Sequence, residues 1–197
     1  MELRIPTHDQ LRTIYHRDLK EAFPEAELKS LATIETMWDQ GQYIPYCLFD
    51  GDAIVGEAFV WLGHPGWALL DYLCVSSTAR NAGLGASVLK SLLEAEPDTV
   101  FFGEEEAPVH APDPAMAERR LAFYFRNGLR MAGYDTEIFG VHYKTLYLAN
   151  RLVEDGPLME EHQFVYRQSF SPQKYRKYIR IPRDPDAEPG EQIPWDQ

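Results

Sequence analysis

Apolar residues recur at helical spacing in the first part of the chain and in shorter continuous runs further on. Thr7 and Gln10 form a capping-box pattern, which predicts that a helix begins after Thr7. A second helix is predicted from Pro24 to Gly41, since apolar side chains return on one face and a glycine ends the pattern. The residues that carry the two helical patterns are Leu11, Ile14, Tyr15, Leu19, Leu28, Leu31, Ile34 and Trp38.

Runs of apolar and β-branched residues predict strands through the middle of the chain. Residues 43–49 and 53–62 flank a turn at 50–52 and are predicted to form a hairpin. A buried central strand is predicted to end at Val75, and a helix is predicted to follow Gly83. The other predicted elements are strands at 2–5, 99–103, 134–141 and 143–149, and helices at 115–127, 157–168 and from Ser171.

Composition places the chain among folded proteins. Its 197 residues are 45% hydrophobic and 13% aromatic, which favours a packed domain over a disordered chain. The formal net charge of −12 argues against a nucleic-acid partner, because phosphate binding needs a basic surface. Cys47 and Cys74 lie in apolar runs and are expected to be reduced core residues. No signal-peptide pattern and no apolar run of about 18 residues occurs, so we expect a cytoplasmic protein without membrane attachment.

Two glycines stand where the central strand gives way to the next helix. Gly83 and Gly85 permit a tight turn and a close backbone approach. A Walker loop would continue with Gly-Lys-Ser/Thr, whereas Ala86 follows Gly85 here, and a dinucleotide fingerprint would need a third glycine. The pattern that remains, Arg80-x-x-Gly83-x-Gly85, opens a helix whose free N–H groups favour an anion.

This pattern resembles the pyrophosphate-binding signature Arg/Gln-x-x-Gly-x-Gly/Ala of the GNAT superfamily, whose members are acetyl-CoA-dependent N-acetyltransferases. A second match lies in a predicted helix, where Tyr124 follows a phenylalanine and precedes Gly128-Leu129, as a Phe-Tyr pair does in GNAT enzymes. The order of the predicted elements before the glycine loop is also that of the superfamily. The resemblance covers residues 1–150, with its specific motifs only between Leu69 and Leu129.

The resemblance implies an α+β, GNAT-like fold for residues 1–150, with a mixed central sheet of six to seven strands flanked by helices. It does not extend beyond residue 150. Residues 151–183 are predicted to be a C-terminal helical extension. Residues 184–197 contain three prolines and five acids and are predicted to be a disordered acidic tail.

The resemblance also implies acetyl-CoA as a co-substrate, without a metal. The backbones of Leu73, Cys74 and Val75 would lie along the pantetheine arm as though it were a further strand. The pyrophosphate would be held by one arginine and by the backbone N–H groups that follow it. The residues of this second group are Arg80, Asn81, Ala82, Gly83, Leu84, Gly85 and Ala86.

Tyr124 and a glutamate are the candidates for proton transfer. By resemblance, Tyr124 would lie beside the thioester sulfur and protonate the departing thiolate; otherwise it is a core aromatic residue. An alkyl ammonium has a pKa of about 10.4, so a base or water must remove its proton before attack. Glu104 and Glu106 are predicted to share one side of a strand and are candidates for this base. They could equally be a solvated strand end.

Further acid–base candidates lie outside that strand. Glu57 stands on the hairpin strand, and His64 and His110 are in predicted loops. A loop histidine is more often simply exposed.

The acceptor and the wider role stay open at this stage. Arginines between residues 111 and 130 and the glutamates at 104–106 are expected to form regions of opposite charge, which favours a small cationic amine over a peptide amine. Six basic residues without an acid lie between 167 and 183, and could dock a second copy of the chain as a homodimer, touch a cofactor phosphate, or be a solvated helix. Two other classes remain: a non-catalytic CoA-binding regulatory module, and an interaction domain without CoA binding.

Overall fold

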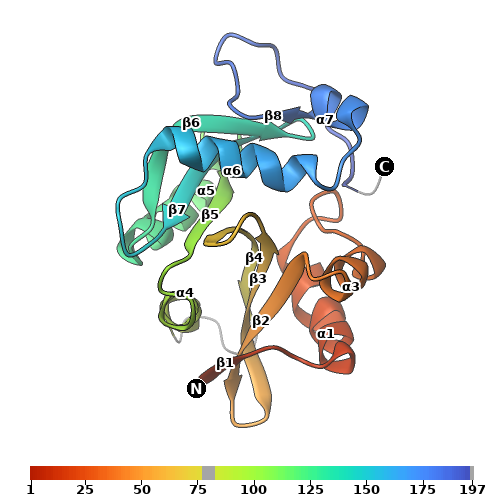
Figure 1. Cartoon of the computed structure of the whole chain (residues 1–197), viewed down its shortest axis with the longest axis vertical. Coiled ribbons are helices and arrows are strands. Elements are labelled where there is room, and N and C mark those ends of the chain that lie inside the picture. Colours follow the sequence, from red (N-terminus) through yellow and green to blue (C-terminus); the bar gives the residue numbers. More distant parts are fainter. Residues whose placement is uncertain (77–82, 196–197) are drawn as a thin grey trace. The chain divides into compact units, whose positions relative to one another are not determined.

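A computed structural model describes residues 1–76 and 83–195 (Figure 1). Its strands are β1 (Glu2–Arg4), β2 (Tyr43–Asp50), β3 (Ala53–Leu62), β4 (Trp67–Val75), β5 (Val100–Glu106), β6 (Arg130–Ile138), β7 (Val141–Leu148) and β8 (Ile179–Arg180). They form an eight-stranded sheet in the order β1-β2-β3-β4-β5-β7-β6-β8. The β4–β5 pair is parallel, whereas β2–β3 and β5–β7 are antiparallel, so the sheet is mixed. The fold is therefore α+β, as predicted, with one strand more than the upper expected number.

Contacts divide the described residues into two compact units. The first contains residues 1–62, 70–97 and the C-terminal residues 194 and 195. The second contains residues 63–69 and 98–193. The division at residues 150 and 183 that was expected from the sequence remains a prediction.

Two of the helices of the first unit, α1 (His8–Ile14) and α3 (Leu31–Asp39), begin at polar side chains that cap them. The others are the π-helix η1 (Tyr15–Leu19), α2 (Lys20–Ala22) and α4 (Leu84–Ala95). The capping box is confirmed, because the Gln10 N–H donates to Thr7 Oγ1 and the Thr7 N–H donates to Gln10 Oε1. The helix predicted from Pro24 begins only at Leu31. Ser30 is its cap, since the Ser30 hydroxyl accepts from the Thr33 N–H.

A close approach at Gly56 fixes α4 on the sheet of the first unit. The hairpin strand β3 spans 53–62, as predicted. A Cβ atom at Gly56 would lie 2.7 Å from Val88 Cγ2, so only glycine lets α4 pack this closely on β3. Val88, Leu89 and Leu92 are the buried residues of α4.

In the second unit, helices pack with the strands β5, β7 and β6. These helices are α5 (Pro114–Arg126), α6 (Asp155–Arg167) and α7 (Pro172–Tyr178). Asp113 caps α5 through the Met116 N–H, and Ser171 caps α7 through the Lys174 N–H. Strand β6 begins at Arg130, earlier than predicted, and the β6–β7 register shifts between Met131 and Asp135. Of the helices that the structure describes, none has the length and apolar character needed to span a membrane.

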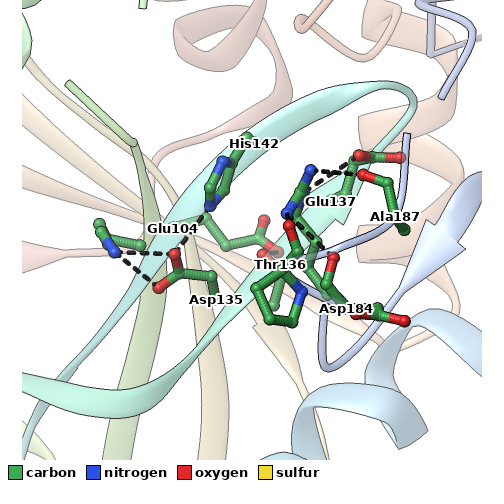
Figure 2. A network of polar contacts seen from close by, with 10 residues as sticks. Glu104, Asp135, Thr136, Glu137, His142, Asp184 and Ala187 are labelled. Atoms are coloured by element: carbon green, nitrogen blue, oxygen red, sulfur yellow. Dashed lines mark hydrogen bonds and ion pairs between the residues drawn. The ribbon is translucent and has the colours of Figure 1, made fainter. Parts of the chain in front are cut away.

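Side chains next to the C-terminal segment contact a buried carboxylate, while the disordered tail expected at 184–197 remains a prediction. Glu137 on β6 is almost fully buried and forms ion pairs with Arg180 and Arg183. The Arg183 guanidinium also donates to the carbonyl of Ala187, which lies near Glu137 in Figure 2. The Gly190 N–H donates to Glu137. A buried carboxylate needs such partners, because an unpaired buried charge is costly.

Trp195 ends the described chain inside the core of the first unit. The Lys29 side chain is 1% exposed, and its ammonium lies 2.8 and 2.7 Å from the two Asp71 oxygens. The ammonium also lies 3.6 Å from the centroid of the Trp195 ring, and the Trp195 N–H donates to the Ala26 carbonyl. The indole therefore covers a buried ion pair.

Trp195→Ala should lower the free energy of unfolding by about 3–5 kcal/mol, because it removes a buried indole and admits water to Lys29. Denaturant unfolding measures this loss. Leu152→Ala is the control, since Leu152 is 79% exposed, and its effect should stay within about 0.5 kcal/mol. Equal effects of the two substitutions would show that Trp195 does not complete the core.

Candidate functional site

The first turn of α4 follows Gly83, and no side chain of the described residues caps its backbone N–H groups. Gly83 is the N-terminal cap residue in the left-handed conformation, with φ of +74°. Leu84, Gly85 and Ala86 form the first turn. A Cβ atom at Gly83 would have no other atom within 4 Å, so the approach is open. This arrangement fits an anionic group such as a pyrophosphate. Arg80, Asn81 and Ala82 lie outside the described residues.

The parallel ladder between β4 and β5 is short. It joins Trp67 with Val100 and ends at Leu69 with Phe102. Leu73, Cys74 and Val75 lie beyond the end of this ladder, so it does not use their backbone groups. Cys74 is buried, whereas Leu73 and Val75 are half-buried.

Tyr124 is held at the end of α5 by a glycine-dependent turn. The Leu129 N–H donates to the Tyr124 carbonyl at 3.1 Å, and the Gly128 N–H donates to the Phe125 carbonyl at 3.2 Å. These two bonds form a Schellman motif, which requires the φ of +87° at Gly128. Tyr124 itself is half-buried, and its ring meets the Phe123 ring edge-on. The prediction that Gly128 ends this helix is confirmed.

Glu104 lies in a hydrogen-bond network with α6. One of its oxygens lies 2.9 Å from His162 Nε2 and accepts from Thr136, and the other accepts from the Tyr166 hydroxyl at 2.7 Å. His162 is fully buried, and its Nδ1 lies 3.2 Å from the Tyr134 hydroxyl. Figure 2 shows Glu104 beside Thr136 of β6. Sequence reasoning missed these partners; their only signal is the i, i+4 spacing of His162 and Tyr166.

Glu105 and Glu106 are bound by one arginine of α5. Arg120 Nε lies 2.7 Å from a Glu105 oxygen, and its terminal nitrogen lies 2.7 Å from a Glu106 oxygen. The expectation of separate basic and acidic regions is therefore wrong for these residues. Strand alternation was expected to place Glu105 and Glu106 on opposite sides, but the long Arg120 side chain reaches both.

A second polar group lies on β6 and β7 (Figure 2). Asp135 accepts from Lys144 at 3.0 and 2.7 Å and lies 2.7 Å from His142 Nε2. Burial alone would raise the pKa of Asp135, but the hydrogen bonds from Lys144 and His142 outweigh it and lower the pKa below its ordinary value.

The two candidate histidines of the loops have different surroundings. The His110 ring packs on the His142 ring at 4.8 Å. His64 Nδ1 lies 2.9 Å from Glu161, and its ring stacks on Phe164. Among the described residues, neither histidine is hydrogen-bonded to Glu104 or Glu106.

The first unit buries an acid cluster around Glu57. The Glu57 side chain is fully buried, and the Cys74 thiol donates to its carboxyl group at 3.0 Å. The pKa of Glu57 is raised to about 8, chiefly by burial and to a smaller extent by Asp18, while the Cys74 hydrogen bond and the charge of Arg17 lower it. A glutamate inside the apolar run 53–62 was the sequence signal for this cluster. Among the described residues, no three His, Cys, Asp or Glu side chains are grouped to hold a metal ion.

Solved structures share this fold over most of the chain. A protein from Bacteroides thetaiotaomicron that is assigned to the GNAT family of acetyltransferases has a TM-score of 0.67 at 21% identity, covering 83% of this chain and 95% of that one. The ribosomal-protein-S18-alanine N-acetyltransferase of Escherichia coli has a TM-score of 0.57 at 18% identity, with 78% and 96% covered. An aminoglycoside 6′-N-acetyltransferase complexed with coenzyme A has a TM-score of 0.55 at 14% identity, with 79% and 100% covered.

These comparisons establish the fold of the chain. The described chain has the GNAT-like α+β fold, and its structural neighbours are GNAT acetyltransferases at low identity. No family model matches the sequence, and no curated protein matches it. At such identities the likeness extends to the fold alone.

The buried Glu57 should make stability fall with rising pH. Its pKa in the folded protein, about 8, lies above the ordinary 4.5, so the folded state keeps a proton that the unfolded chain releases. Its contribution to stability is therefore full below pH 4.5 and is lost as the pH rises to about 8. The loss is on the order of 4 kcal/mol, and Glu57→Gln should abolish it.

Urea unfolding across this pH range measures the effect. Glu94→Gln is the matched control, since the Glu94 side chain is 66% exposed and pairs only with Lys90 among the ion pairs of the described residues. If the free energy of unfolding changed with pH in the same way in the parent protein and in Glu57→Gln, a raised pKa at Glu57 would be contradicted.

Proposed function

We propose that this protein transfers the acetyl group of acetyl-CoA to a primary amine by direct attack in a ternary complex. The observation that carries the proposal is the uncapped start of α4 behind Gly83, at the position of the pyrophosphate signature. The shared fold of GNAT acetyltransferases, one of them complexed with coenzyme A, supports the same reaction class.

In this proposal acetyl-CoA binds along two backbone segments. The N–H groups of the first turn of α4, from Leu84 to Ala86, bind the pyrophosphate together with Arg80 and the loop residues Asn81 and Ala82. The backbone of Leu73–Val75 hydrogen-bonds the pantetheine arm. The end of the parallel ladder at Leu69 supports this role, because the following β4 residues are not paired in it. No metal takes part.

Tyr124 is the proposed general acid. The amine nitrogen attacks the thioester carbonyl, the C–N bond forms and the C–S bond breaks. Tyr124 then donates its phenolic proton to the leaving thiolate, and the amine nitrogen loses a proton to a base. The Schellman motif that fixes the end of α5 supports a defined position for this side chain.

The base is Glu104, Glu106 or a water molecule. Glu104 accepts hydrogen bonds from Thr136 and Tyr166, and Glu106 is paired with Arg120. Both sets of contacts occupy oxygens that would otherwise be free to accept a proton from the amine. We therefore propose that a carboxylate acts through water.

The proposed acceptor is a small cationic amine, with a peptide amine as the alternative. The names of the neighbours include both kinds: one acts on a ribosomal-protein alanine and another on an aminoglycoside. A panel of amines of each kind, followed by thiol release, separates them.

Acetyl-CoA should bind to the parent protein, and Gly83→Val should abolish binding without unfolding the chain. The valine side chain would occupy the open space before the first turn of α4, where the phosphates would lie. Gly41→Val is the matched control, because Gly41 has a similar φ of +71° and open space around it. It carries the same backbone strain, about 1–2 kcal/mol, and should bind normally in calorimetry.

Two results would contradict this prediction. Absence of acetyl-CoA binding to the parent protein would leave an interaction domain as the better description. Equal weakening by Gly83→Val and Gly41→Val would mean that backbone strain, and not the site, reduces the affinity.

Tyr124→Phe should lower kcat roughly ten- to a thousandfold and leave acetyl-CoA affinity unchanged, since the ring stays and the proton donor is lost. Tyr46→Phe is the control; Tyr46 donates to Glu96 on a partly exposed side of the first unit and has no proposed role. Binding without turnover in the parent protein would favour a non-catalytic CoA-binding module. An unchanged kcat in Tyr124→Phe, with chemistry rate-limiting, would return Tyr124 to a packing role.

A further inference from the structure

Two acidic side chains are buried together in the first unit. Asp18 lies in the π-helix η1 with its side chain fully buried, and Glu57 lies on β3, also fully buried. Asp18 Oδ1 and Glu57 Oε1 have no hydrogen-bond donor among the described residues. A buried carboxylate oxygen without a donor is costly, so this pair needs an explanation.

A single proton between Asp18 Oδ1 and Glu57 Oε1 would give both oxygens a hydrogen-bond partner. The other oxygen of each group is satisfied: Arg17 Nε donates to Asp18 Oδ2 at 2.8 Å, and the Cys74 thiol donates to Glu57 Oε2 at 3.0 Å. Burial raises the pKa of Glu57 most, and the neighbouring charge of Asp18 raises it as well. A proton held between the two carboxyl groups therefore completes the cluster.

The charged and titratable groups around this pair come from three further positions. Arg17 flanks Asp18 on η1 and is 44% exposed. Cys47 on β2 is the cross-strand partner of Glu57, and its thiol points to the Pro45 carbonyl. Burial raises the pKa of both Cys47 and Cys74, so the thiols stay protonated. Arg17 is thus the only positive charge among these groups.

The cluster contacts β4 at the segment proposed to receive acetyl-CoA. Cys74 stands between Leu73 and Val75, and its thiol is bonded to Glu57. A π-helix turn, such as the one that carries Asp18, is a strained element that proteins tend to keep at functional positions. Two carboxylates without the proton would repel each other in a buried site and would draw in water or displace η1.

We propose that the proton shared by Asp18 and Glu57 keeps Leu73–Val75 in the conformation that binds acetyl-CoA, so that alkaline pH switches this binding off. The inference rests on the proposed function. Asp18 and Glu57 are positioning residues, since Cys74 transmits their state to the strand and neither carboxyl group touches the ligand.

Calorimetry of acetyl-CoA binding from about pH 7 to about pH 9.5 tests the switch, because the phosphates of the ligand have already lost their protons above about pH 7. The affinity of the parent protein should fall about tenfold for each pH unit above the transition. Glu57→Gln keeps a donor toward Asp18 and an acceptor for Cys74, and its affinity should not change with pH. Cys47→Ala, which leaves both carboxyl groups in place, should keep the pH dependence of the parent protein.

Infrared spectroscopy of the parent protein tests the shared proton without any variant. A carboxylic acid C=O band should persist at neutral pH and vanish in the same pH range in which binding is lost. Affinity that is independent of pH in the parent protein, or a fall that Glu57→Gln retains, would overturn the inference and leave the proposed function intact. Absence of acetyl-CoA binding at every pH would overturn both, while the infrared band would still report whether the proton is there.

Discussion

Burial of charge is the constraint on which the rest of this structure depends. Each unit places ionised side chains in its core, and each of these must be paired because an uncompensated buried charge costs several kcal/mol. Lys29 is neutralised by Asp71 and covered by Trp195. Glu137 on β6 is paired with Arg180 and Arg183. The segments that supply the partners are far apart in the sequence.

The same constraint separates what could be predicted from what could not. Local signals were reliable: the capping box at Thr7, the hairpin strand at 53–62 and the glycine after α5 depend on neighbouring residues, and all three are found. The start of α3 was misplaced because Ser30 competes with Pro24 as the first residue of a helix. The partners of Glu104 could not be predicted, since they come from α6.

Disorder was expected at the C-terminus from prolines and acids alone. Composition measures how much apolar surface a segment can bury, but it does not register a buried carboxylate elsewhere, such as Glu137, that binds arginines just before the segment. The candidate site shows the same limit. Its backbone elements, Gly83 and the end of β4, follow from local sequence, whereas the contacts of Glu57 depend on side chains of η1, β2 and β4.

The position of Trp195 has a consequence for how the protein is made and handled. Lys29 and Trp195 are far apart in the sequence, so the core of the first unit can close only after Trp195 has left the ribosome. Before Trp195 is available, the Lys29 ammonium lacks the indole ring that covers it in the folded protein. A purification tag fused at the C-terminus would begin close to that packed indole, and one fused at the N-terminus, where Met1 is 68% exposed, would leave the closure undisturbed.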